Sequence, residues 1–256
     1  MAGGFYESDA AVEQYLLFHY GTPAQICPLL PVARAACGFP ARCVSEPIAR
    51  MKWNVKTRAR FKQQGRALDL GCATGRSSFE LRRHFGQVLG IDFSERFVAA
   101  ARQMRQQQAM TVRAHREGPA YDEMIVGLPK HLRADHVEFE KGDACALRAD
   151  LGSFDFVLMA NLVDRLPDPV RCLARLPKLV SPGGWLVITS PYTWLEEYTP
   201  RDKWLIAEEG GTLGALRKNL ASAFALREAF DLPFLIREHR RKFQWSVAEV
   251  SLWRRA

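Results

Sequence analysis

The chain has 256 residues, of which 48% are hydrophobic and 25% are charged, so it can bury the substantial core of an ordinary globular protein. No apolar run is long enough to cross a bilayer, and the N-terminus lacks the basic-then-apolar order of a secretory signal, which argues against a membrane partner. The net charge of +8 indicates, in decreasing order of weight, an arginine-rich surface, an anionic small substrate or RNA, because no RNA-binding module accompanies it.

Residues 1–65 precede the first predicted strand and are expected to be helical in two pieces. Apolar and aromatic side chains recur at helical spacing between Ala10 and Tyr20, and residues 45–64 predict a second helix. Prolines at positions 28, 31 and 40 interrupt the stretch between these two helices. The pattern therefore predicts a helical unit over residues 1–65 ahead of a main domain over residues 66–256.

The segment 67–78 predicts a buried strand, a glycine-bearing turn and the first turn of a helix. Gly71 and Gly75 can adopt backbone angles closed to other residues, which lets the main chain approach a ligand closely. Amides at the start of the helix then point at that ligand. Ala73 stands where a dinucleotide-binding turn has a second glycine, so the D-x-G-x-x-x-G pattern resembles instead the S-adenosylmethionine turn of class I methyltransferases. The alternative is a tight turn in another α/β protein.

Two further predicted strands end in acidic residues. Residues 87–94 predict a strand ending at Asp92, about twenty residues beyond the turn, where an acidic side chain accepts both ribose hydroxyls of an adenosine-type cofactor. The alternative role for Asp92 is a helix N-cap. Residues 136–144 predict a strand ending in Gly-Asp-Ala, and Asp143 resembles the methyltransferase residue that binds the adenine amino group.

The remaining core elements follow in the order of the same fold. Residues 153–162 predict a strand that runs into Asn161, and residues 181–189 predict a Pro-Gly-Gly turn and a fifth strand. A hairpin over residues 232–254 with its turn at 240–246 adds the last two strands. We expect an α/β fold of the Rossmann-like class I methyltransferase type, with a seven-stranded, mostly parallel sheet, an antiparallel last strand and an N-terminal helical cap.

Two insertions interrupt this order. Residues 109–135 are too long for a plain connection, and Glu117-Gly118-Pro119 between two alternating segments predicts a β-hairpin. Residues 191–200 follow the fifth strand and should face the site, because ligands of open α/β sheets bind at the carboxyl ends of the strands. Within this loop Tyr192 and Thr193 are the preferred substrate contacts, whereas Trp194 and Tyr198 are also explained by packing of the loop.

Several longer stretches together resemble the mercaptohistidine (5-thiohistidine) N-methyltransferase family of ovothiol biosynthesis. The stretches are Tyr15–Gly21, Leu68–Leu81, Gly142–Cys145, Ala160–Pro167, Thr189–Pro200 and Arg237–Trp245. This family occurs as the C-terminal region of ovothiol synthases and as free-standing proteins, and the similarity runs from about residue 5 to the C-terminus. Thr74 and Asp164 depart from the pattern of the family.

The resemblance implies an enzyme that uses S-adenosylmethionine to methylate an imidazole nitrogen of 5-thiohistidine (4-mercaptohistidine), giving ovothiol A and S-adenosylhomocysteine. The chain is too short for the iron-dependent sulfoxide synthase portion, so a separate sulfoxide synthase is the implied functional partner. In small-molecule methyltransferases of this kind the N-terminal helices commonly fold over the cofactor. The alternatives are a methyltransferase acting on another small molecule or on RNA, and a cofactor-binding protein that has lost catalysis.

The same resemblance assigns the site residues. Cofactor contacts are expected at Asp69, Gly71, Cys72, Ala73, Gly75, Asp92, Phe93, Asp143, Ala144, Asn161 and Leu162. Substrate contacts are expected at Tyr15, Tyr20, Asn161, Arg165, Tyr192, Thr193, Glu196 and Arg241. Among the latter, Arg165 or Arg241 suits a substrate carboxylate through a bidentate contact. Solvated surface is a comparable explanation for residues of the last hairpin turn.

A proton acceptor is also expected, because a thiohistidine tends to be a thiolate with a protonated ring and the acceptor nitrogen needs a free lone pair. The candidates are Asp164, Glu196, Glu197, Tyr192 and His239, with Asp164, Tyr192 and His239 assigned as catalytic. The sequence does not rank them firmly.

The cysteines predict neither disulfides nor a metal site. They stand at positions 27, 37, 43, 72, 145 and 172, without a C-x-x-C pair or a zinc-like spacing to histidine. We interpret them as reduced thiols of a cytoplasmic protein. Cys72 and Cys145 fall in predicted ligand turns, where they are better explained as small lining residues than as nucleophiles.

Overall fold

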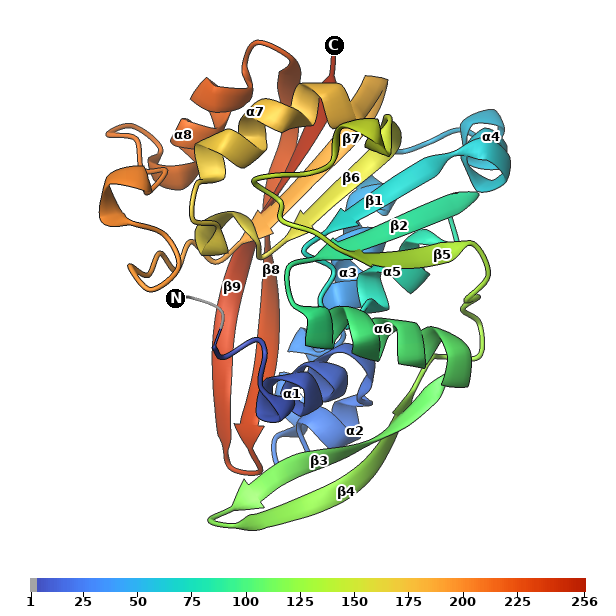
Figure 1. The fold of residues 1–256 in the computed structure, drawn as a ribbon, viewed down its shortest axis with the longest axis vertical. Coiled ribbons are helices and arrows are strands. Elements are labelled where there is room, and N and C mark those ends of the chain that lie inside the picture. The colour runs from blue at the N-terminus through green and yellow to red at the C-terminus, as the bar shows by residue number, and fades with distance from the viewer. Residues whose placement is uncertain (1–3) are drawn as a thin grey trace.

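The computed structural model describes residues 4–256 as one seven-stranded sheet with helices on both faces and a separate hairpin (Figure 1). The order of strands in the sheet is β5-β2-β1-β6-β7-β9-β8. The strands are β1 (Arg66–Leu70), β2 (Gln87–Asp92), β5 (Val137–Lys141), β6 (Phe154–Ala160), β7 (Val180–Ser190), β8 (Phe224–His239) and β9 (Lys242–Arg255). The first five strands in this order run parallel, whereas β9 is antiparallel to both β7 and β8. The expected fold class is therefore confirmed.

The parallel strands alternate their side chains between two buried clusters, one on each face of the sheet. In β6, Phe156 and Leu158 join the cluster with Phe79 of α5, whereas Val157 joins the cluster with Leu176 of α7. This alternation is the period of two that a strand imposes. The covering helices are α5 (Arg76–Leu81) and α6 (Glu95–Gln107) on one side, and α7 (Pro169–Leu179) and α8 (Gly211–Leu220) on the other (Figure 1).

The last two strands are longer than the sequence predicts. The turn comprises residues 240–241 instead of 240–246, and β8 begins at Phe224 rather than at 232. Because β8 is the edge strand, its exposed side chains at Arg227, Glu228 and Asp231 resemble a loop in the sequence. Pro233, which has no backbone N–H, is tolerated there because an edge strand has a neighbouring strand on only one side.

The N-terminal region contains more helices than expected. They are α1 (Asp9–Tyr20), α2 (Pro23–Ile26), α3 (Phe39–Arg50) and α4 (Val55–Gln64), with a short 3-10 helix at Pro31–Ala36. The single helix predicted over 45–64 is wrong, because the chain restarts at Asn54, whose side chain accepts the N–H of Thr57 and caps α4. Leu16 and Val44 lie in the same buried cluster as Phe79 and Val187 of the sheet domain.

Residues 109–127 form a two-stranded antiparallel sheet of β3 (Ala109–Glu117) and β4 (Ala120–Gly127). The hairpin extends from the body of the protein beside α1 and the tip of β8–β9 (Figure 1). Arg237 of β8 fixes it, because the guanidinium donates to the carbonyl of His115 at 3.2 Å and pairs with Asp122. Further short 3-10 helices stand at Ala149–Leu151, Val163–Arg165 and Arg201–Lys203.

Replacement of Gly75 by alanine should destabilise the protein more than the same change at Gly38. Both glycines precede a helix with positive φ, +90° at Gly75 and +69° at Gly38, which costs an alanine roughly 1–2 kcal/mol. A Cβ at Gly75 would also lie 2.6 Å from the ring of Phe139, and overpacking costs roughly another 1–3 kcal/mol, whereas no atom lies within 4 Å at Gly38.

Urea unfolding of the two variants measures this difference. Phe139→Leu in the Gly75→Ala background should recover part of the loss, because the crowding atoms are removed. Equal losses at Gly75 and Gly38 would show that the Phe139 ring moves aside at no cost.

Candidate functional site

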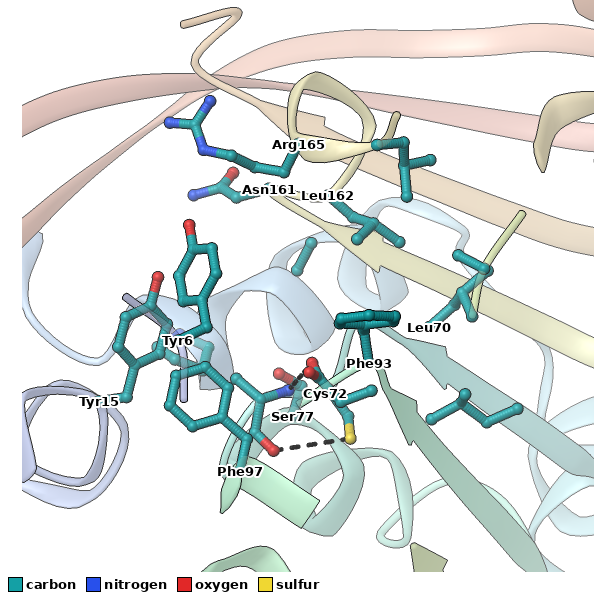
Figure 2. Close-up of a pocket in the computed structure, with 18 of the residues that line it drawn as sticks. Tyr6, Tyr15, Leu70, Cys72, Ser77, Phe93, Phe97, Asn161, Leu162 and Arg165 are labelled. Carbon is teal, nitrogen blue, oxygen red and sulfur yellow. Dashed lines mark hydrogen bonds between the residues drawn. The ribbon is translucent and has the colours of Figure 1, made fainter. Parts of the chain in front are cut away.

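A cavity of about 410 Å³ lies at the carboxyl edge of the parallel strands (Figure 2). It is lined by the turn after β1, by residues that follow β2, β5 and β6, and by side chains of α1, α3 and α6. The volume is in the range of small-molecule sites, about 300–1,000 Å³, and far too small for a folded nucleic acid. Rossmann-like sheets bind their ligands at this edge.

The turn after β1 exposes its main chain to the cavity because three residues adopt positive φ, namely Gly71 (+80°), Ala73 (+46°) and Gly75 (+90°). The N–H groups of Gly71 and Cys72 both donate to the carbonyl of Ile91 in β2, at 2.8 and 3.1 Å. A Cβ at Gly71 would lie 2.9 Å from the side chain of Leu162. Gly71, Cys72 and Ala73 line the cavity, whereas Gly75 does not and has a conformational role.

Asp92, at the end of β2, connects the turn with the cavity. Its Oδ2 accepts the N–H of Ala73 at 2.8 Å, and its Oδ1 accepts the N–H of Ser94 at 2.9 Å. The N-cap of α6 is Ser94, which accepts the N–H of Phe97, so the alternative role of Asp92 as a helix cap is wrong. Each carboxylate oxygen keeps a lone pair for the ribose hydroxyls. Burial raises the pKa of Asp92 to about 6.

Asp69 lies behind the turn rather than in the cavity. It is fully buried, its Oδ2 accepts the hydroxyl of Ser78 at 2.6 Å, and it is absent from the cavity lining. Among the described residues its Oδ1 has no hydrogen-bond partner, and burial raises the pKa of this carboxyl to about 7. Asp69 can therefore act on a ligand in the cavity only indirectly, through a bridging group.

The other expected cofactor residues line the cavity. Asp143 and Ala144 follow β5, and the Oδ1 of Asp143 accepts the N–H of Cys145 at 2.8 Å, which orients the carboxylate. Asn161 after β6 has a φ of +50°, and its Oδ1 accepts the hydroxyl of Thr189 at 2.9 Å. The remaining lining residues of this group are Phe93, which is 62% exposed, and Leu162.

An aromatic wall closes the side of the cavity near Asn161. The rings of Tyr15 and Phe97 have centroids 4.8 Å apart, and Tyr6 contacts both of them and also Tyr198. Figure 2 shows the hydroxyls of Tyr6 and Tyr15 pointing toward Asn161 and Arg165.

Burial raises the pKa of all three tyrosines of this wall, in Tyr15 and Tyr198 to about 12, while the charge of Arg165 opposes the shift. The hydroxyls of Tyr6, Tyr15 and Tyr198 are therefore protonated at neutral pH. Together with Arg165 they form a set of hydrogen-bond donors beside Asn161.

Asp164, assigned as catalytic from the sequence, is a structural carboxylate here. It is 1% exposed, and its Oδ2 accepts the guanidinium of Arg165 at 3.1 Å and the N–H of Thr193 at 3.0 Å. Burial raises its pKa, with Arg165 opposing. The carboxylate thus positions Arg165 and the loop after β7, and does not line the cavity.

Tyr192 and His239, the other two residues assigned as catalytic, also lie outside the cavity lining. The hydroxyl of Tyr192 donates to Glu249 of β9 at 2.7 Å, and the residue has a positive φ of 55° that turns its side chain toward β9. His239 stands at the tip of β8, where its ring contacts His115 of the hairpin. The long β8–β9 ladder carries this tip beyond the cavity, which the short predicted strands did not indicate.

Four expected substrate contacts are likewise not brought to the cavity. Thr193 and Arg241 are exposed, Glu196 is exposed and pairs with Arg201, and Tyr20 is buried with its hydroxyl donating to the carbonyl of Thr74. The residues brought together are instead Tyr15, Asn161 and Arg165. The sequence missed several others as site residues, namely Tyr6, Phe18, His19, Phe39, Ser77, Phe97, Tyr198 and Ile236.

The part of the chain that the structure describes contains neither a metal site nor a membrane-spanning helix. Within residues 4–256, no three His, Cys, Asp or Glu side chains are grouped closely enough to hold a metal ion. Over the same residues, no helix has the length and apolar character that crossing a bilayer requires.

Comparison with known proteins assigns the central part of the chain. Residues 68–188 match the family model described as a methyltransferase domain. A demethylmenaquinone methyltransferase of Oceanobacillus iheyensis is 28% identical over 140 residues, 53% of this chain and 49% of that protein. A ubiquinone biosynthesis O-methyltransferase of Coxiella burnetii is 25% identical over 123 residues, 48% of this chain and 42% of that protein. The chain thus spans about half the length of the curated relatives it matches.

A solved structure of an S-adenosylmethionine-dependent methyltransferase from Methanosarcina mazei has the same fold. It aligns with a TM-score of 0.50 and 18% identity, over 79% of this chain and 97% of that one. The domain match and the relatives show that residues 68–188 are similar to a methyltransferase domain, and the solved structure shows the same fold. The matched region carries Asp92, Asp143 and Asn161, whereas the tyrosines of the aromatic wall lie outside it.

Cofactor affinity should fall as the pH decreases through about 6. The prediction follows from the expected role of Asp92 as acceptor of the ribose hydroxyls, because below its raised pKa the protonated carboxyl loses acceptor capacity. We expect S-adenosylhomocysteine to bind roughly tenfold more weakly at pH 5 than at pH 7, because about one charge-assisted hydrogen bond is lost. Isothermal titration calorimetry at the two pH values measures this difference.

The variant Asp92→Asn should bind weakly and lose the step near pH 6, which separates Asp92 from Asp69 with its pKa of about 7. The control is Asp150→Asn, because Asp150 is an exposed acid that precedes β6 at the opposite edge of the sheet. An unchanged step in Asp92→Asn would exclude Asp92 as the ribose acceptor.

Proposed function

We propose that the protein transfers the methyl group of S-adenosylmethionine to an imidazole nitrogen of 5-thiohistidine, giving ovothiol A. The observation that carries this proposal is the donor set beside Asn161, formed by Arg165 and the hydroxyls of Tyr6, Tyr15 and Tyr198. The family resemblance described above points to the same substrate. A separate sulfoxide synthase would supply the thiohistidine.

The donor set favours an acceptor that carries negative charge. Three protonated hydroxyls and one guanidinium lie on this wall, and the cavity lining also holds the carboxylates of Asp92 and Asp143. A thiohistidine offers two anionic groups, a thiolate and a carboxylate, and both accept hydrogen bonds from such donors. Arg165 suits the carboxylate because a guanidinium forms bidentate contacts with it.

The sequence suggests that a side chain of the protein removes the proton of the imidazole ring, but the cavity offers none of the expected acceptors. Asp164, Tyr192, Glu196 and His239 do not line the cavity, and the tyrosines of the wall are too weakly acidic to exist as phenolate bases at neutral pH. We infer that the ring binds with a lone pair already exposed on the accepting nitrogen, its proton having left to water. Donors around the thiolate support this state because they balance its charge.

The chain contributes alignment and exclusion of water to the reaction. When bound, S-adenosylmethionine supplies a methyl group activated by its sulfonium, so one C–S bond breaks as one N–C bond forms. The ring of Tyr15 and the side chain of Asn161 limit where an imidazole can lie. Holding two reactants in contact replaces a bimolecular encounter by an oriented step, which accounts for much of the rate enhancement of such enzymes.

A second candidate is methylation of another electron-rich small molecule, such as a quinol. The relatives whose names describe quinone-pathway methyltransferases favour it, as do the apolar walls formed by Phe18, Phe39 and Ile236. RNA is less favoured, because the cavity is small and lies under the N-terminal helices.

Purified protein incubated with S-adenosylmethionine and 5-thiohistidine, followed by mass spectrometry, tests the proposal. Histidine, a short-chain quinol and bulk RNA serve as parallel acceptors. We expect methylated thiohistidine with little product from the others. Methylation of the quinol alone would favour the second candidate, and cofactor binding without any product would contradict both.

The variant Arg165→Gln should lower kcat/KM for thiohistidine roughly a hundredfold, since a bidentate charge-assisted contact contributes about 2–3 kcal/mol. The affinity for S-adenosylhomocysteine should change little, because the guanidinium serves the acceptor. Arg171→Gln, an exposed arginine on α7, is the matched control. Parallel losses of cofactor affinity and kcat/KM in Arg165→Gln would assign Arg165 to the cofactor instead.

A further inference from the structure

A buried histidine of the N-terminal helix faces the cavity and has no role in the function proposed above. His19 lies in the last turn of α1, is only 8% exposed, and its ring lines the cavity. Aromatic rings surround it, because the ring centroids of Tyr15, Phe18 and Tyr20 lie 5.9, 5.6 and 6.2 Å from that of His19. A polar side chain in such surroundings is costly unless a partner satisfies it.

The hydrogen bonding of His19 fixes which ring nitrogen carries the proton. The backbone N–H of Arg76 donates to Nδ1 at 3.4 Å. An amide N–H can only donate, so Nδ1 is the lone-pair nitrogen and the neutral ring is protonated on Nε2. Burial, with the charge of Arg76, lowers the pKa of His19 to about 3, so the ring is neutral at physiological pH.

His19 therefore presents a single N–H donor and has no lone pair left for use as a base. Among the hydrogen bonds of residues 4–256, none satisfies Nε2, and the side of the ring that remains open is the cavity. A ligand that occupies this part of the cavity must offer an acceptor, or the N–H stays unsatisfied at a cost of about 1–3 kcal/mol.

The attachment of α1 shows which part of the cofactor lies there. The hydroxyl of Tyr20 donates to the carbonyl of Thr74 at 2.6 Å, so successive residues of α1 contact the glycine turn and the residue after it. Asp143 and Asp92, expected to hold adenine and ribose, follow β5 and β2, and the glycine turn follows β1, next in the sheet. The cavity thus extends from the adenosine residues past the glycine turn to His19.

We propose that the Nε2–H of His19 binds the carboxylate at the amino-acid end of S-adenosylmethionine. The carboxylate is an acceptor for the N–H that faces the cavity, and the tautomer is set in advance by the backbone N–H of Arg76. His19 is a binding and positioning residue for the cofactor, and its role does not depend on the identity of the acceptor.

A pair of ligands tests this assignment without any methyl transfer. S-adenosylhomocysteine carries the amino-acid end, whereas 5′-methylthioadenosine has the same adenosine and sulfur but lacks the carboxylate. Measured by calorimetry, His19→Phe should lower the affinity for S-adenosylhomocysteine roughly tenfold to a hundredfold, which corresponds to one hydrogen bond to a charged group. The affinity for 5′-methylthioadenosine should stay within a factor of about two of the wild-type value. His19→Gln, which keeps an N–H donor, should recover part of the difference.

The comparison separates binding from a structural role. Tyr20→Phe removes the hydrogen bond from the Tyr20 hydroxyl to the carbonyl of Thr74, and should change the affinities for both ligands by the same factor. Equal losses for both ligands in His19→Phe, or no loss for either, would overturn the proposal. If His19→Phe fails to fold, histidine-selective nitrogen NMR of the wild-type protein decides, because the Nε2–H signal should shift with S-adenosylhomocysteine and stay in place with 5′-methylthioadenosine. Because only binding is measured, failure here leaves the thiohistidine proposal untouched.

Discussion

The constraint on which the site depends is the closure of the glycine turn onto the end of β2. The carbonyl of Ile91 accepts two successive N–H groups of the turn, and the Asp92 carboxylate accepts a third, from Ala73. Gly71 and Gly75 adopt positive φ freely, whereas Ala73 is strained there, and its bond to Asp92 helps to hold it. Parallel pairing of β1 with β2 thus creates the cradle, and the same carboxylate that fixes it is presented to the ligand.

The N-terminal segment is joined to this turn by direct hydrogen bonds. Tyr20 and His19 bond to residues of the turn and of α5, while the carbonyl of Tyr6 accepts the hydroxyl of Ser94 at the start of α6. Cofactor cradle and aromatic wall are therefore positioned by the same helices. The helices α1 and α3 also share a hydrophobic cluster with the sheet. The division into two domains at residue 65 stays a prediction, and it follows the order of elements along the chain rather than the way in which they pack.

The residues that the sequence identified are those whose place follows from local spacing. A strand, a glycine turn and an acidic residue about twenty positions later are fixed by one βαβ unit, so the place of Asp92 was predictable, and Asn161 followed from the end of a later buried strand. Tyr6 precedes any periodic pattern, and Phe97 fits a helical core stripe equally well, so neither signalled a site. Tyr192 and His239 lie outside the cavity lining because their directions depend on the register and length of β8 and β9, which only tertiary pairing sets.

The distribution of charge in the cavity suits a transfer between groups of opposite charge. Among the groups that line the cavity, Asp92 and Asp143 are carboxylates, Arg165 is a guanidinium, and His19 and the tyrosines are neutral at physiological pH. A sulfonium that meets an anionic acceptor loses charge as the methyl moves, and a reaction that destroys charge proceeds more readily where water is excluded. A wall of neutral hydroxyls and apolar rings meets that requirement, because it can hydrogen-bond an anion, and the one guanidinium beside it, Arg165, is paired with Asp164 throughout.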